Sequence, residues 1–365
     1  MATCFSMARI RSEFFGAIKM KKVIRFFLLA VAAVGVMFGC DRADPNAGAP
    51  NAASPNTASP NTAKTTALIP ITLQLNWVPE PEFGGLFAAL QDGLYVAEGL
   101  AVDIRKGGAQ VPCAQLVASG QVPFAIVSGE EVLTLRARGG EIVAVFATFQ
   151  RNPTGFMLHK NNPIDSLEAL WKSSSTIGID PGMPFVAILN EKYGGQNLKM
   201  VPYSGALATF LVTPDSVQQC FITAEPVEAK LRGVEAKVLS LAEVFNPYSA
   251  VIATNETYLK ENGATVEAFV RATTQGWIRY LANPEKYNPA IAALNPSMTL
   301  EAMNIAAELE RSLITPASGA SDIGQMTMDR WSSLGQQLVD TKVIPACAPV
   351  ENAFLSRGKS AKQAP

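Results

Sequence analysis

The chain has 365 residues and a formal net charge of −1, and apolar residues make up 48% of it against 17% charged residues. This length and composition allow two ordinary domains with sizeable cores and exclude a globally disordered chain. The single histidine, His159, excludes metal sites that need two histidines, and the sequence has neither a basic stripe nor a zinc-finger spacing. We therefore expect no metal, no cofactor and no nucleic-acid partner.

The N-terminal segment is typical of an export signal. Cationic residues from Lys19 to Arg25 precede the apolar run FFLLAVAAVGVMF at positions 26–38. A run of this length is too short to cross a hydrocarbon core of about 30 Å as a helix. We therefore predict a secretory signal peptide over residues 1–39, with a buried helix as the alternative.

The apolar run ends just before Cys40 and resembles a bacterial lipoprotein box, although Met37 and Phe38 stand where such boxes usually carry Leu and a small residue. We expect Cys40 to be lipidated and to hold the protein on a membrane without a spanning helix. Asp41 resembles the signal that retains Gram-negative lipoproteins at the inner membrane, which predicts the periplasmic face of the inner rather than the outer membrane. Residues 40–66 repeat SPNTA and contain no large apolar side chain, so we expect a flexible tether.

Short apolar runs alternate with helical stretches in the first half of the folded part. Strands are predicted at 71–76, 101–106, 124–127 and 142–148, and helices at 83–92, 112–119 and 130–138. Glycines follow several of these helices, as expected for helix ends. This alternation predicts βαβ units and a mostly parallel sheet.

A second set of the same kind follows, and then a helical region. Strands are predicted at 176–179, 199–203, 218–223 and 238–241, and helices from 184, at 206–212, 225–231, 266–281, 300–313 and 327–339. We therefore predict an α/β protein of two lobes with a cleft between them. The first lobe comprises 67–155 and 249–357 and the second 156–248, with chain crossings near 153–158 and 247–252.

The residues that follow the predicted strands form the candidate site, because ligands of open α/β sheets bind beyond the carboxyl ends of the strands. Nine positions are predicted to bind the ligand: Asn76, Trp77, Glu82, Gly84, Ser128, Met183, Tyr203, Glu225 and Tyr248. Trp77 can stack on a flat heterocycle, and Asn76 offers both a donor and an acceptor to a ring. The alternatives are a core tryptophan and a turn asparagine. Tyr203 and Tyr248 can cover the opposite ring face, or can serve only as strand-end and hinge aromatics.

The acidic residues Glu80, Glu82 and Glu225 are candidates for hydrogen bonds to a ligand's amino group or ring N–H. The alternative for Glu225 is an acid favoured by the dipole at a helix N-terminus, and for Glu80 and Glu82 a solvated surface. Helix starts near Gly84, Ser128 and Met183 suit anions. However, these loops contain no Arg or Lys, which argues against a sulfonate or phosphate as the main determinant.

The segment LQLNWVPEPEFGGLFAALQDGLYVAEGLAVDI, followed by Gly107-Gly108, resembles the N-terminal signature of a family of periplasmic binding proteins. The later segments FITAEP at 221–226, SAVIATNETYLK at 249–260 and the helix start at 325–327 also fit, so the resemblance covers roughly residues 70–355. The family includes binders of thiamine pyrimidine precursors, riboflavin, alkanesulfonates, taurine and nitrate. The resemblance implies the type 2 periplasmic binding protein fold. It also implies that Glu225 is a ligand carboxylate, with Ala224 where the family motif has Asn.

The resemblance implies a solute-binding lipoprotein that captures a small flat N-heterocycle by hinge closure and delivers it to the permease and ATPase of an ABC importer, acting as a monomer. The alternatives are a receptor of the same fold for another family ligand and a sensory lipoprotein without a transporter. A pyrimidine synthase is a further alternative. That branch carries a cysteine-rich motif and a reactive histidine, whereas Cys113 and Cys220 are isolated and His159 is expected to be exposed outside the cleft. With Cys347 they allow at most one disulfide, and free, half-buried thiols are expected.

Overall fold

The computed structural model describes residues 67–108, 110–180, 182–195, 197–203, 205–346 and 350–356, all within one unit of the chain that spans residues 63–365. The predicted signal peptide, Cys40, the tether and Cys347 lie outside the described residues. No described helix is both long enough and apolar enough to cross a membrane.

The first sheet has five strands in the order β2-β1-β3-β10-β4. These are β1 (Ile69–Gln74), β2 (Leu100–Arg105), β3 (Phe124–Val127), β4 (Val143–Ala147) and β10 (Val251–Thr254). Strand β1 pairs in parallel with β2 and β3, whereas β10 lies antiparallel between β3 and β4. The sheet therefore takes its fourth strand from a segment about a hundred residues downstream of its neighbours.

The second sheet has the order β7-β6-β8-β5-β9. Its strands are β5 (Thr154–His159), β6 (Thr176–Ile179), β7 (Lys199–Pro202), β8 (Val217–Phe221) and β9 (Ala236–Ser240). Strand β6 is parallel to β7 and β8, and β5 is antiparallel to β8 and β9. Both sheets are therefore mixed, and the two antiparallel strands, β5 and β10, are those at which the chain enters each sheet from the other.

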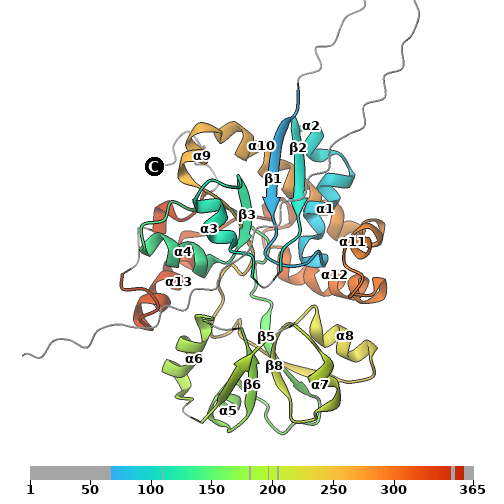
Figure 1. Ribbon diagram of the computed structural model, residues 1–365, viewed down its shortest axis with the longest axis vertical. Helices are drawn as coiled ribbons and strands as arrows, with labels where there is room; N and C mark the ends of the chain where they lie inside the picture. Colours follow the sequence, from blue (N-terminus) through green and yellow to red (C-terminus); the bar gives the residue numbers. More distant parts are fainter. Residues whose placement is uncertain are drawn as a thin grey trace, which may run out of the picture. The chain divides into compact units, whose positions relative to one another are not determined.

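The helices cover the two sheets separately. Around the second sheet lie α5 (Leu167–Lys172), α6 (Phe185–Tyr193), α7 (Ala208–Val212) and α8 (Glu225–Leu231), as Figure 1 shows. The others are α1 (Gly84–Gln91), α2 (Leu94–Ala97), α3 (Cys113–Ala118), α4 (Gly129–Ala137), α9 (Glu256–Glu261), α10 (Gly263–Ala282), α11 (Asn288–Leu294), α12 (Leu300–Ile314) and α13 (Met328–Asp340). The short 3-10 helix η1 (Pro81–Phe83) leads directly into α1.

The structure confirms several predicted elements residue for residue, namely β3, β6 and α8. The predicted crossing near 153–158 overlaps strand β5 of the second sheet, where no strand was predicted. The segment TGFMLH has an almost wholly buried side-chain pattern. It therefore lacks the alternation of apolar and polar residues that marks a half-exposed strand. It also begins with Thr-Gly after Pro153, a sequence that is typical of a loop.

Close helix packing explains the double glycine at the start of α1. A Cβ atom on Gly84 would lie 2.2 Å from Cζ of Tyr280, and one on Gly85 would lie 2.2 Å from the ring of Trp277. Both aromatic side chains belong to α10 and are buried in the first core. Glycine is therefore required here so that α1 can lie directly against α10.

Arg330, near the start of α13, ties together the two segments that join the sheets. Its Nη1 donates to the carbonyl of Gln150 at 2.6 Å, and its Nε and Nη2 donate to the carbonyls of Asn246 and Pro247 at 2.8 and 2.6 Å. The guanidinium also lies 3.9 Å from the ring centre of Tyr248. One side chain thus holds backbone groups of both connecting segments in a fixed geometry.

We predict that Arg330→Lys lowers the free energy of unfolding by about 1–3 kcal/mol, because an ammonium group cannot satisfy three carbonyls in this fork geometry. Urea denaturation followed by circular dichroism measures this change. Arg311→Lys is the matched control, because Arg311 is exposed and its ion pair is with Glu308 one helical turn away. Equal unfolding free energies for the two variants would contradict this role of Arg330.

Candidate functional site

Trp77 reaches from the end of the first sheet to a loop of the second. It follows β1 and donates a side-chain hydrogen bond to Glu80. Its ring packs beside Gly205, where an added Cβ would lie 3.2 Å from Cζ2 of Trp77. Gly205 has a φ of +71° and follows β7, so the loop comes close to the indole without a side chain between them. Trp77 is therefore at a junction of the two lobes.

Tyr203 and Glu225 face each other at the ends of strands in the second sheet. The hydroxyl of Tyr203 donates to Oε1 of Glu225, and the backbone N–H of Phe221 donates to Oε2 at 2.9 Å. Burial raises the pKa of the Glu225 carboxyl, and the hydrogen bond from Tyr203 opposes that rise. Burial, followed by the nearby Glu225 charge, raises the pKa of Tyr203, which keeps its hydroxyl a donor.

Four buried or half-buried acids act on one another at this junction: Glu80, Glu82, Glu225 and Glu310, which we call the carboxyl cluster. Burial raises the pKa of Glu80 to about 8, with the Glu225 charge as the next cause. Burial also raises the pKa of Glu82 well above its usual range, and the charges of Glu80, Glu310 and Glu225 add to the effect. Like charges in a poorly solvated place cannot all ionise, so part of the cluster is protonated at neutral pH.

The cluster draws on both lobes and on the C-terminal helices. Glu80 and Glu82 lie at η1, Glu225 opens α8, and Glu310 lies on α12. Asn295, just before α12, places its Nδ2 3.5 Å from Oε1 of Glu80. Asn295 and Glu310 were not among the predicted residues. A signal for Glu310 existed, since it falls at a core-facing position of the apolar pattern in 300–313.

Asn76 directly precedes Trp77 and lies against the glycine turn 107–108. Its Oδ1 is buried and has no hydrogen-bond partner among the described residues. Its carbonyl accepts from the N–H of Gly108 at 3.2 Å, and a Cβ on Gly107 would lie 2.1 Å from the carbonyl oxygen of Leu75. The glycine turn therefore packs directly on the end of the strand.

The other predicted positions have structural contacts of their own. Ser128 caps α4, accepting from Glu131 N at 3.2 Å while its own N–H donates to Glu131 Oε2 at 2.8 Å. Tyr248 is buried against Trp331, its hydroxyl accepts from Thr327 N at 2.9 Å, and its carbonyl accepts from Gly129 N at 2.9 Å.

Gly84 packs under Tyr280, and Met183 packs on the second core cluster. Of the predicted residues, Glu82 and Glu225 therefore belong to the carboxyl cluster, and Trp77 and Tyr203 donate hydrogen bonds to acids of that cluster. Ser128 and Tyr248 meet each other around Gly129, next to the connecting segments.

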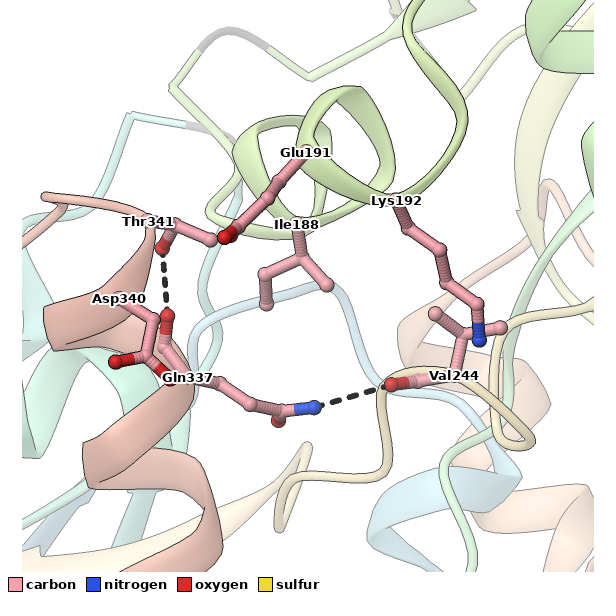
Figure 2. A pocket seen from close by; sticks show the side chains of 7 residues that line it. All are labelled: Ile188, Glu191, Lys192, Val244, Gln337, Asp340 and Thr341. Atoms are coloured by element: carbon pink, nitrogen blue, oxygen red, sulfur yellow. Dashed lines mark hydrogen bonds between the residues drawn. The ribbon is translucent and has the colours of Figure 1, made fainter.

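A separate pocket lies between α6 and α13 (Figure 2). It is lined by Ile188, Glu191, Lys192, Val244, Gln337, Asp340 and Thr341. Gln337 Nε2 donates to the carbonyl of Val244 at 3.1 Å, which fixes one wall. None of the predicted ligand residues lines this pocket.

The single histidine is half-buried, and Cys113 and Cys220 are buried. His159, expected to be exposed, is half-buried on β5: its Nε2 is 2.6 Å from the carbonyl oxygen of Phe210 and its ring packs on that residue. Cys113 and Cys220 are free and fully rather than half buried, and burial raises the pKa of Cys113 to about 12. Among the described residues no group of three or more His, Cys, Asp or Glu side chains is placed to hold a metal ion.

The architecture is that of the periplasmic binding proteins, as predicted. The chain superposes on the periplasmic aliphatic sulphonate binding protein SsuA from Escherichia coli with a TM-score of 0.61 and 12% identity, over 79% of this chain and 97% of that one. Similarity at this level of identity concerns the fold alone.

The chain belongs to the family described as NMT1/THI5 like, whose model matches residues 80–287. It is 32% identical over 231 residues to the riboflavin-binding protein RibY of Chloroflexus aurantiacus, covering 59% of this chain and 64% of RibY. It is 25% identical over 227 residues to the formylaminopyrimidine-binding protein of Halalkalibacterium halodurans, covering 60% and 69%. The match to RibY thus spans less than two thirds of that protein. The family resemblance predicted from the sequence is confirmed.

The raised carboxyl pKa values predict the pH dependence of stability. An acid whose pKa is higher in the folded than in the unfolded chain stabilises the fold at low pH and loses this contribution as pH rises. For Glu80 the window runs from about 4.5 to about 8. We expect the ligand-free protein to lose about 2–4 kcal/mol of unfolding free energy across this window, and Glu80→Gln to flatten the profile. Urea titrations at several pH values test this, with the exposed Glu235→Gln as control. A profile that rises with pH in the wild type would contradict it.

Proposed function

We propose that this chain is the solute-binding lipoprotein of an ABC importer, and that it captures a small flat N-heterocycle, such as a thiamine pyrimidine precursor, between its two lobes. The single observation that carries the proposal is the junction at which Trp77 and Glu80 of the first lobe meet the Tyr203–Glu225 pair of the second. The family and the names of its two relatives support the same class of ligand.

The ligand would lie at this junction when the lobes close on it. Trp77 and Tyr203 supply aromatic faces, Asn76 an unsatisfied amide oxygen, and Glu82 and Glu225 the carboxyl groups for a polar ring edge. A cluster of acids repels anions. It therefore disfavours a sulfonate or nitrate, although chains of this fold bind them.

Closure would be a hinge movement of the lobe 67–155 and 249–357 relative to the lobe 156–248. Asn152, on the first connecting segment, bonds through its N–H to Asn246 Oδ1 at 2.8 Å and through its Nδ2 to the Phe245 carbonyl at 2.9 Å. Together with Arg330, these bonds couple the two connecting segments, so that they would move as one hinge.

Riboflavin is the second candidate ligand, because the relative named for riboflavin binding is 32% identical. Its isoalloxazine ring is also flat and carries an edge of alternating donors and acceptors. Calorimetry with riboflavin and with formylaminopyrimidine on the same protein separates the two candidates.

In this proposal the protein is a receptor and not an enzyme. Lipidation of Cys40 would hold it at the periplasmic face of the inner membrane, and the tether over residues 40–66 would let a monomeric domain reach its permease and ATPase. The ring of His159, the one histidine of the chain, lies 2.6 Å from the backbone carbonyl oxygen of Phe210 on α7.

We expect Glu225→Gln to weaken binding of formylaminopyrimidine or riboflavin about ten- to a hundredfold. The amide nitrogen would replace one acceptor oxygen, so that an N–H group of the ligand would face a donor, and such a mismatch in a buried site costs about 1–3 kcal/mol. Isothermal calorimetry measures the change, and Glu235→Gln, on the exposed surface, is the control. Unchanged affinity would assign Glu225 a structural role only.

We expect Cys40→Ser to abolish lipid labelling and to release the mature protein from membranes, because the acyl chain would be its sole attachment. Metabolic labelling with a radiolabelled fatty acid and fractionation of cells measure both effects. Cys113→Ser is the control, since Cys113 is buried in the folded domain. Membrane retention of the Cys40→Ser protein at unchanged mature size would overturn the anchor.

A further inference from the structure

Glu310 is a buried carboxyl group that the fold itself leaves unsatisfied. It lies in the middle of α12 with a relative exposure of 1%, and its Oε2 has no hydrogen-bond partner among the described residues. It shares its helix face with Ala306, Ala307 and Leu313, all buried in the first core. A polar atom left unpaired in such a place costs stability, so its presence calls for a partner that the folded chain alone does not provide.

The helix that carries Glu310 packs on both lobes near the ligand junction. Helix α12 contacts η1, which carries Glu82, and α8, which begins at Glu225. At its N-terminus, the N–H of Thr299 is 3.4 Å from Oε1 of Glu228 on α8. Glu310 is therefore the acid of the carboxyl cluster that comes from the C-terminal helices, and it lies beyond residue 287, where the family match ends.

The groups around Glu310 favour its neutral form. The titratable groups on the helices and turns packed against α12 are Glu80, Glu82, Glu225, Glu228, Lys230, Glu267, Arg271, Arg279, Tyr280, Glu285 and Lys286. Lys286 is exposed and pairs with Asp92. Burial, followed by the Glu80 charge, raises the pKa of Glu310 well above its usual range. A neutral carboxyl group carries an O–H donor and a carbonyl acceptor side by side, unlike a carboxylate, which only accepts.

We propose that Glu310 is a specificity-determining residue of the ligand site, and that its neutral carboxyl group reads an edge of the ligand on which a hydrogen-bond acceptor and an N–H donor are adjacent. Its O–H donates to a ring nitrogen or carbonyl, and its C=O accepts from the neighbouring N–H. The ligand class is then an uncharged planar heterocycle with an aminopyrimidine or lactam edge, rather than a cation or an anion. This inference rests on the proposed function.

The sharpest experiment compares Glu310→Gln with Glu310→Met, with riboflavin and formylaminopyrimidine as probes in calorimetry at pH 6. A glutamine amide offers the same adjacent donor and acceptor as a neutral carboxyl group, whereas methionine has a similar length and offers neither. For the probe that the wild type binds more tightly, we expect the affinity of Glu310→Gln to stay within about threefold of the wild type. We expect the affinity of Glu310→Met to fall at least tenfold. Glu308→Gln and Glu308→Met, on the exposed face of the same helix, are the matched controls.

A pH series adds a readout that a purely structural role would not change. Ionisation removes the O–H donor, so wild-type affinity should fall as pH rises from 6 to 9, and Glu310→Gln should fall less steeply because the amide does not titrate. Glu310→Met should also melt at a higher temperature than the wild type in the absence of probe, because it removes an unpaired buried polar group.

The outcomes separate the proposal from its premise. If the wild type binds neither probe, the proposed ligand class fails and this inference falls with it. If the wild type binds a probe and Met binds equally well, Glu310 lies outside the site. If Glu310→Gln loses as much affinity as Glu310→Met, the ionised carboxylate binds the ligand as an acceptor. That outcome overturns the inference of a neutral carboxyl group, while the proposed receptor function stands. Should Glu310→Met not fold, the Gln variant and its pH profile decide the question.

Discussion

The arrangement of this protein depends on one constraint: four carboxyl groups from both lobes meet where little water is left to solvate them. Burial and mutual repulsion push their pKa values upward, as the value of about 8 for Glu80 illustrates. The nearest compensation comes from neutral donors, namely the Trp77 indole and the Tyr203 hydroxyl, and not from lysine or arginine. In the proposed receptor, a junction built in this way would disfavour anions and would leave hydrogen-bonding capacity for an uncharged ligand.

The rest of the fold holds these acids in place. Close packing of α1 on α10, which two glycines permit, fixes η1 and hence Glu80 and Glu82. The second sheet fixes Glu225 through the strand end at Phe221. Helix α12 then contacts both η1 and α8, and through Thr299 at its N-terminus, whose N–H lies 3.4 Å from Oε1 of Glu228, it links the first lobe to the second.

The sequence was sufficient to predict most of the fold and several of the candidate residues that the structure brings together. Strands β3 and β6 were recognisable because their apolar runs end at clear turn signals, and Trp77 and Glu225 became candidates because they follow such strands. Strand β5 was missed because it is buried along nearly its whole length and begins with Thr-Gly. Asn295 and Glu310 were missed because they follow no strand. The apolar pattern of 300–313 marks Glu310 as core-facing. Only the contact of α12 with η1 and the contact of Asn295 with Glu80 show that both lie near the carboxyl cluster, and such long-range contacts leave no local pattern in a sequence.

The place of β10 in the first sheet has a consequence for the order of folding. This strand lies between β3 and β4, yet the chain reaches it only after the whole second sheet, Thr154 to Ser240, has been made. During synthesis the second sheet can therefore fold from one continuous segment of the chain. Until β10 is available, the edges of β3 and β4 that pair with it stay unpaired. Closing that gap requires contacts between residues about a hundred positions apart, which are slow to form. The lobe that begins the domain is thus the last to be completed, and its open edges must be protected until residue 254 has emerged.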